Sequence, residues 1–306
     1  MKYVIYTLTI FSSLVAFSQH ANFNTQKNWS LNKKEILFGI GATQFTGDVG
    51  GSDGIGKDYS LRDLDLRATR FSGLIGFRYR FAPMWSTTTV LNFGMLAGDD
   101  AYTEDIVRKS RNLHFRSWVV ELNQRIEFIL YSNEGFVSSK NTSKARNKNE
   151  RIYLFSGIGI NYFYSQAKYN NEWVGLRALK TEGQGLAGGP SEYLPITATI
   201  PMGIGFRTAL GRMWSIGIEA SYVKTFSDYI DDVHGVYYDP SNLSSSAAQH
   251  LSNPAQVNSA WFNPGSKRGD SQNDSYYYLN FVVSKNITYK DNKRNSGGII
   301  KGRYKF

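Results

Sequence analysis

The chain contains no cysteine, and this absence removes several classes of protein from consideration. Without a thiol the chain cannot carry a lipoprotein anchor, a disulfide scaffold or a thiolate metal site. Long hydrophobic runs are missing as well, because no stretch beyond residue 17 approaches the roughly 20 apolar residues that a membrane-spanning helix needs. If the mature chain enters a membrane, we expect it to do so as a closed β-barrel, which satisfies every backbone polar group within lipid.

The one short apolar run lies at the N-terminus. Met1 and Lys2 precede an apolar stretch at 3–17, which ends in Ala16-Phe17-Ser18-Gln19. One basic residue, a short apolar core and small residues before a cleavage point are typical of a secretory signal peptide. We therefore expect residues 1–18 to be removed, so that the mature chain begins near Gln19.

Aromatic residues and glycine are abundant, with 20 tyrosines, 19 phenylalanines, 6 tryptophans and 29 glycines. The formal net charge is +10 and falls to +9 when Lys2 is removed with the signal peptide. A positive charge is compatible with nucleic acid, anionic lipid or acidic protein partners. Export argues against nucleic acid, so outer-membrane lipid, lipopolysaccharide and acidic proteins remain as expected partners.

Apolar side chains alternate with small or polar ones in repeated segments of about ten residues, the pattern of transmembrane strands. Residues 71–81 show it clearly, with Ile75 and Phe77 on one face and Gly76 and Arg78 on the other. The pattern predicts an all-β, eight-stranded antiparallel transmembrane barrel. The eight segments are 35–45, 71–81, 85–95, 115–131, 151–167, 196–210, 213–226 and 275–285.

An even number of strands places both ends of the barrel sheet on the periplasmic side, where turns are short. Turns 82–84 and 211–212 fit this rule, and the long connections 47–70, 97–114, 168–194 and 227–274 are then extracellular. The connection 132–150 is periplasmic by count but long. Pro201 cannot donate to a strand ladder, so we expect it at the end of its strand or at a bulge.

The charged side chains that face inward predict a filled interior. An eight-stranded barrel has room for its own side chains and little more, and unpaired buried charges cost several kcal/mol. We therefore expect these residues to form paired plugs, and we do not expect a conducting pore. They are Arg78, Arg80, Glu121, Arg125, Glu127, Arg207 and Glu219.

The predicted organisation is a signal peptide at 1–18, a periplasmic N-terminal segment at 19–34, the barrel at 35–285 and a basic periplasmic tail at 286–306. Two basic elements face the periplasm in this scheme, and they are either solvated charge runs or docking surfaces for an acidic partner. The candidate partner-facing residues are Lys140, Lys144, Arg146 and Lys148 in the long turn, and Lys290, Lys293, Arg294, Lys301, Arg303 and Lys305 in the tail.

Several segments resemble the PorG family of Bacteroidota outer-membrane proteins, which is associated with the type IX secretion system. They are Gly41-Ala42-Thr43-Gln44-Phe45-Thr46-Gly47-Asp48, Arg111-Asn112-Leu113-His114-Phe115-Arg116-Ser117, Thr181-Glu182-Gly183-Gln184-Gly185-Leu186, Pro201-Met202-Gly203-Ile204-Gly205 and Lys224-Thr225-Phe226-Ser227-Asp228-Tyr229-Ile230-Asp231-Asp232-Val233. The signature residues are Arg111, Asn112, Phe115, Arg116, Ser117, Asp228, Tyr229, Asp231 and Asp232.

The resemblance implies a multi-pass outer-membrane protein that is not an enzyme and takes part in secretion and gliding motility. PorG-like barrels are linked to a periplasmic ring of PorK and PorN. The implied function is to tether or position that ring beneath the outer membrane, and we expect the basic turn and tail to contact it.

Two other functions remain open. One is a passive barrel with a structural or surface-binding role, for which the aromatic residues of the long loops, such as Tyr237 and Trp261, could serve. The other is a rim hydrolase, in which His234 would be oriented by Asp231 or Asp232. The plainer interpretation is that these two aspartates pin a loop turn.

No cofactor or metal is expected from the motifs. Asp48, Asp53 and Asp58 lie in a glycine-rich loop that could form a weak calcium site, but their spacing does not fit a calcium-binding loop.

Overall fold

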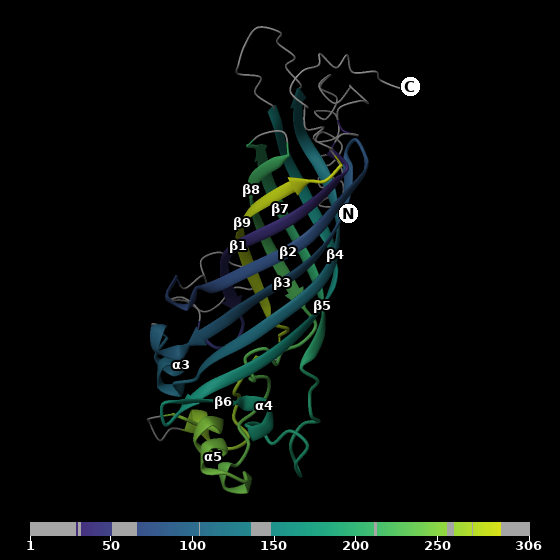
Figure 1. The fold of residues 1–306 in the computed structure, drawn as a ribbon. Helices are drawn as coiled ribbons and strands as arrows, with labels where there is room; N and C mark the ends of the chain where they lie inside the picture. Colours follow the sequence, from purple (N-terminus) through teal and green to yellow (C-terminus); the bar gives the residue numbers. More distant parts are fainter. Residues whose placement is uncertain are drawn as a thin grey trace, which may run out of the picture.

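The computed structural model describes residues 29, 32–50, 66–103, 105–135, 148–210, 213–255, 260–270 and 272–288, which form a closed antiparallel β-barrel (Figure 1). Its strands follow the order β1-β2-β3-β4-β5-β7-β8-β9, and β9 pairs back to β1. The predicted eight-stranded barrel is confirmed. The strands are β1 (Lys34–Thr46), β2 (Arg70–Ala82), β3 (Trp85–Asp99), β4 (His114–Gly135), β5 (Lys148–Tyr169), β7 (Ile196–Ala209), β8 (Trp214–Thr225) and β9 (Ser275–Asn286).

Short elements gather at the end of the barrel opposite the β2–β3 turn, at the bottom of Figure 1. A short strand, β6, pairs with the outer end of β5. The described parts of the long connections there carry three short α-helices. These elements are β6 (Glu172–Gly175), α3 (Ile106–Arg111), α4 (Leu176–Leu179) and α5 (Ser246–Ser252). Among the described residues, no helix is long and apolar enough to cross a membrane.

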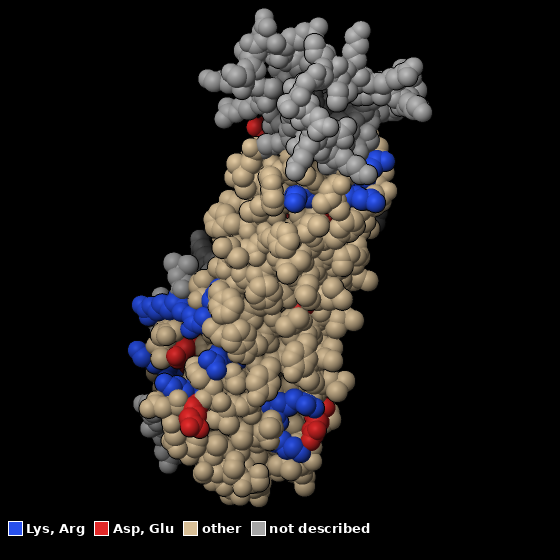
Figure 2. Space-filling view, in the orientation of Figure 1, with Lys and Arg blue, Asp and Glu red and all other residues tan. Residues whose placement is uncertain are grey.

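The strands turn their apolar residues outward, as their period of two predicts. On β2, Ile75 and Phe77 are 50% and 42% exposed, whereas the intervening Gly76 and Arg78 face the buried interior. Figure 2 shows the result on one face, a broad band nearly without charged side chains between charged groups at both ends. A closed barrel with an apolar belt and a polar interior is the architecture of outer-membrane proteins. The chain is an outer-membrane β-barrel.

Aromatic side chains mark the two borders of the apolar band. Trp85 packs on Phe128 at the end with the tight turns, with ring centroids 4.8 Å apart. Phe71 packs edge-on against Trp118 at the opposite border, at 5.7 Å. Such aromatic belts lie at the level of the lipid headgroups. Because periplasmic turns are short in barrels of this kind, the end with the β2–β3 turn is periplasmic and the helices lie on the extracellular side.

Two strands are longer than the sequence pattern predicted. β4 and β5 have 22 residues each, although a tilted transmembrane strand needs about 9–11. The two strands stay paired to Gly135 and Lys148, so the predicted turn 132–150 is wrong at its edges. Lys148 belongs to β5, and residues 136–147 lie outside the described part.

The extracellular rim is uneven because the strands end at different heights. β5 pairs with β7 up to Tyr162 and Ile196, then continues to Tyr169 with β4 and β6 beside it. On the other side, the β1–β9 pairing ends at Thr46 and Ser275. The tall wall of β3, β4 and β5 therefore stands opposite a short wall of β8, β9 and β1, and the extracellular loops fill the space between them.

Pro201 lies inside β7, not at the strand end or bulge that the sequence suggested. It pairs with Val223 of β8 in continuous register. On the other side, the ladder to β5 is interrupted between the pairs Ser156–Met202 and Gly159–Thr199, without a change of register. The missing proline N–H thus costs a local gap in one ladder and leaves the barrel register intact.

Candidate functional site

The periplasmic half of the interior is filled by a charged plug centred on Arg78. Its Nε lies 2.7 Å from Glu127 Oε2, and its Nη2 lies 3.1 Å from Glu219 Oε1. Its Nη1 lies 3.3 Å from Glu35 Oε2. One guanidinium thus joins carboxylates from three other strands, which closes the barrel with its own side chains.

Three further arginines complete the charged plug. Arg125 Nη1 lies 3.1 Å from Glu219 Oε2, Arg207 contacts Glu35, and Arg151 Nη1 lies 3.7 Å from Glu35 Oε1. All of these side chains are at least 96% buried. The predicted pairing of interior charges is confirmed for Arg78, Arg125, Glu127, Arg207 and Glu219.

Two residues assigned to the plug have a different environment. Glu121 is held by neutral donors, namely Asn123, Thr199 and Tyr276. Arg80 donates from Nε to the carbonyl oxygen of Pro83 at 3.1 Å, in the periplasmic turn. Glu35 and Arg151 were not predicted as plug residues. Each is the first residue of a predicted segment, 35–45 or 151–167, in the inward phase, and that phase was the signal available to find them.

The extracellular half of the interior is apolar above the plug. A buried cluster there includes Phe45, Leu96, Phe163 and Ile230. Phe45 and Phe115 meet edge to face at 4.8 Å, and Tyr193 stacks on Tyr229 at 4.3 Å. This packing resembles the core of a soluble domain and supports the loops that cover the barrel mouth, here called the extracellular cap.

Arg111 ties the first two extracellular loops of the cap to the last. It ends α3, where Asn112 adopts the left-handed conformation at φ 58°. Its Nε and Nη2 donate to both carboxylate oxygens of Asp100 at 2.7 and 2.9 Å. It also donates to the carbonyl oxygens of Asp48 and Arg268 at 2.7 and 2.8 Å. A buried bidentate pair of this kind fixes both position and orientation.

Arg268 makes the second buried ion pair of the cap. Its Nη1 lies 2.9 Å from Glu182 Oε1 and 2.9 Å from the carbonyl oxygen of Asp232. Asp232 in turn accepts hydrogen bonds from Thr181 and Tyr193. Burial, opposed by Arg268, raises the pKa of Asp232 to about 6.

The signature residues of the family resemblance all lie at this end. Phe115 packs inside the mouth, and the Ser117 hydroxyl lies 3.2 Å from that of Ser165. On the outer face, the Arg116 guanidinium stacks 3.9 Å above the ring of Trp173. By contrast, the candidate partner-facing residues lie outside the described part, except Lys148, at the start of β5.

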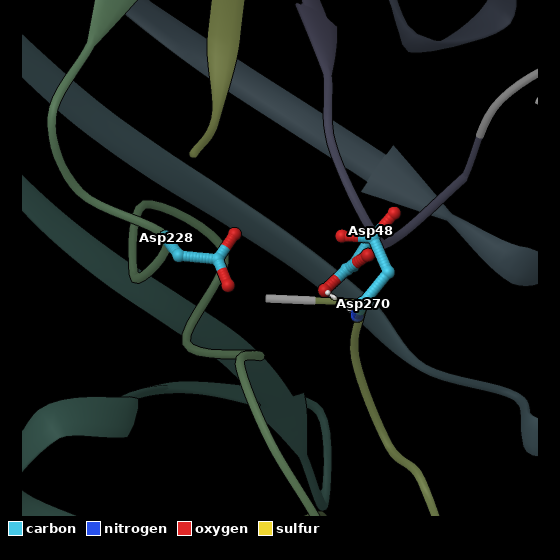
Figure 3. A group of neighbouring side chains, drawn as sticks. All are labelled: Asp48, Asp228 and Asp270. Atoms are coloured by element: carbon cyan, nitrogen blue, oxygen red, sulfur yellow. Dashed lines mark hydrogen bonds between the residues drawn. The ribbon is translucent and has the colours of Figure 1, made fainter. Parts of the chain in front are cut away.

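Three aspartates converge at the extracellular ends of β1, β8 and β9 (Figure 3). One carboxylate oxygen from each of Asp48, Asp228 and Asp270 lies within 4.8 Å of the others. Asp48 and Asp228 are 7% and 5% exposed, whereas Asp270 reaches solvent. We call this group the carboxylate cluster. Oxygen ligands in this arrangement are those that hard divalent cations take.

Burial and mutual repulsion disfavour ionisation in the carboxylate cluster. Burial, then Asp231, then Asp48 raise the pKa of Asp228 to about 10. Burial and Asp270 raise the pKa of Asp48 to about 7. Burial also raises the pKa of the adjacent Asp274 well above its usual range. The cap therefore holds carboxylates that lack enough positive charge.

The hydrolase interpretation depended on His234 with Asp231 or Asp232, and the geometry differs from it. His234 Nδ1 lies 2.6 Å from Asp228 Oδ2 instead. Asp231 accepts the backbone N–H groups of Val49 and Val233, so the interpretation that it pins a loop turn is confirmed.

Two other sequence expectations concern the loops. Asp53 and Asp58, the suggested partners of Asp48 in a calcium site, lie outside the described residues. The partners that the structure gives Asp48 are far away in sequence, which explains why motif spacing missed them. Tyr237, expected at the surface, is 2% exposed, whereas Trp261 is 57% exposed.

No family model and no curated protein matches the chain. Among solved structures, it is similar to Neisserial surface protein A, at 7% identity over 83% of this chain and 97% of that chain, with a TM-score of 0.37. It is also similar to Ail, the attachment invasion locus protein of Yersinia pestis, at 10% identity over 83% and 98% of the two chains and a TM-score of 0.32. The N-terminal barrel of Pseudomonas aeruginosa OprF matches at 8% identity over 83% and 97%, with a TM-score of 0.31. These scores are low, and the fold assignment rests on the strand pairing of the chain itself.

Proposed function

We propose that this barrel is a non-enzymatic accessory component of the type IX secretion machinery. In this role it tethers or positions a periplasmic ring of the PorK and PorN type beneath the outer membrane. The basic turn and the basic tail, with Lys144 and Lys293 among their cations, would contact the ring on the periplasmic side.

The observation that carries the proposal is the convergence of the segments that resemble the PorG family. Asp48, Arg111, Glu182 and Asp232 come from four of the five segments. They are joined in one buried network: Arg111 binds the carbonyl of Asp48, and Arg268 links Glu182 to Asp232. The fifth segment, which begins at Pro201, lies in the barrel wall. Segments that resembled the PorG family only by chance would not be expected to meet in one network. Their convergence therefore supports a structure shared with that family.

The charged plug supports a tethering role over transport. Arg78 and its glutamates occupy the interior where a channel would run, and a filled barrel of this size has no space for a solute. A protein of this kind acts through its two ends, and the periplasmic end is the one available to an inner ring.

Affinity purification of the tagged barrel from its native membrane tests the proposal. We expect ring proteins to co-isolate with the wild type. Replacing Lys290, Lys293, Arg294, Lys301, Arg303 and Lys305 by glutamine should reduce that yield without changing the amount of barrel. The matched control replaces exposed extracellular cations, Lys109 and Lys168, by glutamine. Absence of ring proteins, together with normal secretion by cells that lack the barrel, would contradict the proposal.

A surface-binding role is the second candidate, favoured by the exposed aromatic side chains of the cap. Trp173 and Trp261 are 40% and 57% exposed. Such residues anchor many interfaces. If ring proteins do not co-isolate, while Trp261→Ala abolishes adhesion of cells to a surface, this second function would replace the first.

A further inference from the structure

We propose that the extracellular cap binds one calcium ion between Asp48, Asp228 and Asp270. Asp48 comes from the loop after β1, and Asp228 and Asp270 come from the two ends of the connection between β8 and β9. These strands are neighbours in the barrel, so the ion would join loops that are far apart in sequence at the rim of the short wall.

The distances suit calcium. Calcium takes carboxylate, carbonyl and water oxygens at 2.3–2.6 Å, so two ligands on opposite sides of the ion lie up to about 5 Å apart. The three carboxylate oxygens lie within 4.8 Å of one another. Figure 3 shows the Asp228 carboxylate directed at those of Asp48 and Asp270. Three carboxylates leave positions for water, as is common for calcium on flexible loops.

An orphaned oxygen points to a missing ligand. One oxygen of each carboxylate is occupied: Asp228 Oδ2 by His234, Asp48 Oδ2 by the N–H of Asp270, and Asp270 Oδ1 by the N–H of Gln272. Asp228 Oδ1, by contrast, is buried and has no hydrogen-bond partner among the described residues. The same is true of Oδ1 of the neighbouring Asp274, a residue that is 1% exposed. A buried carboxylate oxygen without a donor is costly, and a cation would satisfy it.

The charge balance of the cap favours a cation over any other ligand. The buried cations of the described part of the cap are Arg111 and Arg268, and each is paired, with Asp100 and Glu182 respectively. The buried Asp48, Asp228, Asp231 and Asp274 are left without an arginine or lysine partner among the described residues. Uncompensated buried charge costs several kcal/mol. One divalent cation bound at the carboxylate cluster would neutralise that negative charge.

The glycines beside the site leave the room that the carboxylates use. A Cβ at residue 269 would lie 2.3 Å from Asp48 Oδ2, and a Cβ at residue 47 would lie 2.3 Å from Asp274 Oδ1. Any side chain at these positions would displace a carboxylate. Asp270 is exposed, so an ion can enter from the extracellular side, where calcium is available.

Calorimetric titration of the chain, purified in detergent and stripped of metal, tests the proposal with calcium chloride. We expect one calcium ion per barrel. In Asp270→Asn, calcium affinity should fall by about tenfold or more, because affinity depends on ligand charge. Asp239→Asn is the matched control: it removes an exposed carboxylate of the same cap that binds Ser241, and it should bind calcium as the wild type does.

Asp270 is exposed, so its replacement should not prevent folding, and Asp228→Asn provides a second variant with the same expected loss. Heat-modifiable migration on gels would show that each variant keeps its barrel. The proposal is overturned if the wild type binds no calcium at millimolar concentration, if Asp239→Asn weakens binding as much as Asp270→Asn, or if magnesium binds as tightly as calcium. None of these outcomes bears on ring binding, so this test is independent of the proposed function.

Discussion

Two parts of this barrel bury carboxylates, and they differ in what surrounds them. In the charged plug, Glu35, Glu127 and Glu219 lie among Arg78, Arg125, Arg151 and Arg207. In the cap, Arg111 and Arg268 are paired with Asp100 and Glu182, and within the described part of the chain no arginine forms an ion pair with the carboxylate cluster. Each carboxylate of the plug has an arginine partner within the chain, whereas the carboxylates of the cluster need a proton or a cation from outside.

The largest effect is expected from breaking the plug at its centre. Arg78→Met leaves three buried glutamates with one fewer guanidinium, and removing one partner of a buried ion pair costs about 3–5 kcal/mol. Urea unfolding in lipid vesicles would measure the loss in the free energy of unfolding. Lys168→Met, an exposed cation at the end of β5, should change it by less than about 0.5 kcal/mol. Equal losses in the two variants would contradict a structural role for the plug.

A smaller and more local effect is expected from the cap. Arg111→Met removes hydrogen bonds to Asp100, Asp48 and Arg268. Each bond is worth about 1.5–3 kcal/mol because the guanidinium is charged, and the total loss should be smaller than the sum of the separate bonds. We expect faster proteolysis in the extracellular loops and an unchanged transmembrane barrel. Lys109→Met, on the same helix, should leave the cleavage rate at the wild-type level. Loss of the whole barrel in Arg111→Met would show that the cap and the plug unfold as one unit.

The cap should also respond to pH in a definite direction. The pKa of Asp48 is raised to about 7 in the folded cap, above the 3.8 expected when unfolded, so the folded cap binds more protons between these values. When calcium is removed with a chelator, the free energy of unfolding of the cap should therefore rise by about 1–2 kcal/mol as the pH falls from 8 to 6. Loop proteolysis at each pH would measure this change. Saturating calcium should remove the gain, and a cap that loosens on acidification in chelator would contradict the assignment.

The strand pattern could be predicted from sequence because successive side chains face opposite sides of a strand. Ile75 and Phe77 point to lipid and Arg78 to the interior, as expected. The ends of β4 and β5 could not be predicted, since residues 132–135 are polar on both faces and only the ladder between the strands keeps them extended. Pro201 was misassigned because proline, which has no N–H donor, is expected only at strand ends or bulges. A closed barrel tolerates the single gap that it leaves in one strand ladder.

The cap was much harder to predict. Asp48, Asp228 and Asp270 meet because β1, β8 and β9 are neighbours in the closed barrel, and no local spacing records that fact. A signal did exist: Asp48 and Asp228 lie just beyond the predicted extracellular ends of 35–45 and 213–226, and Asp274 lies just before 275–285. Acids at the same end of adjacent strands could have been grouped once the strand order was fixed.

The most direct test of the contrast is one chemical change made in both regions. Glu219→Gln removes the charge that Arg78 and Arg125 bind, and it should lower the free energy of unfolding in calcium-free buffer at pH 8 by about 1–3 kcal/mol. Burial and neighbouring carboxylates raise the pKa of Asp228 to about 10, so folding at pH 8 makes this group take up a proton that the unfolded chain does not hold. Asp228→Asn removes that cost, and it should raise the protection of the cap from proteolysis by about 1 kcal/mol under the same conditions. Opposite signs are the predicted result. A loss of stability in both variants would contradict the claim that the carboxylate cluster, unlike the glutamates of the plug, has no arginine or lysine partner among the described residues.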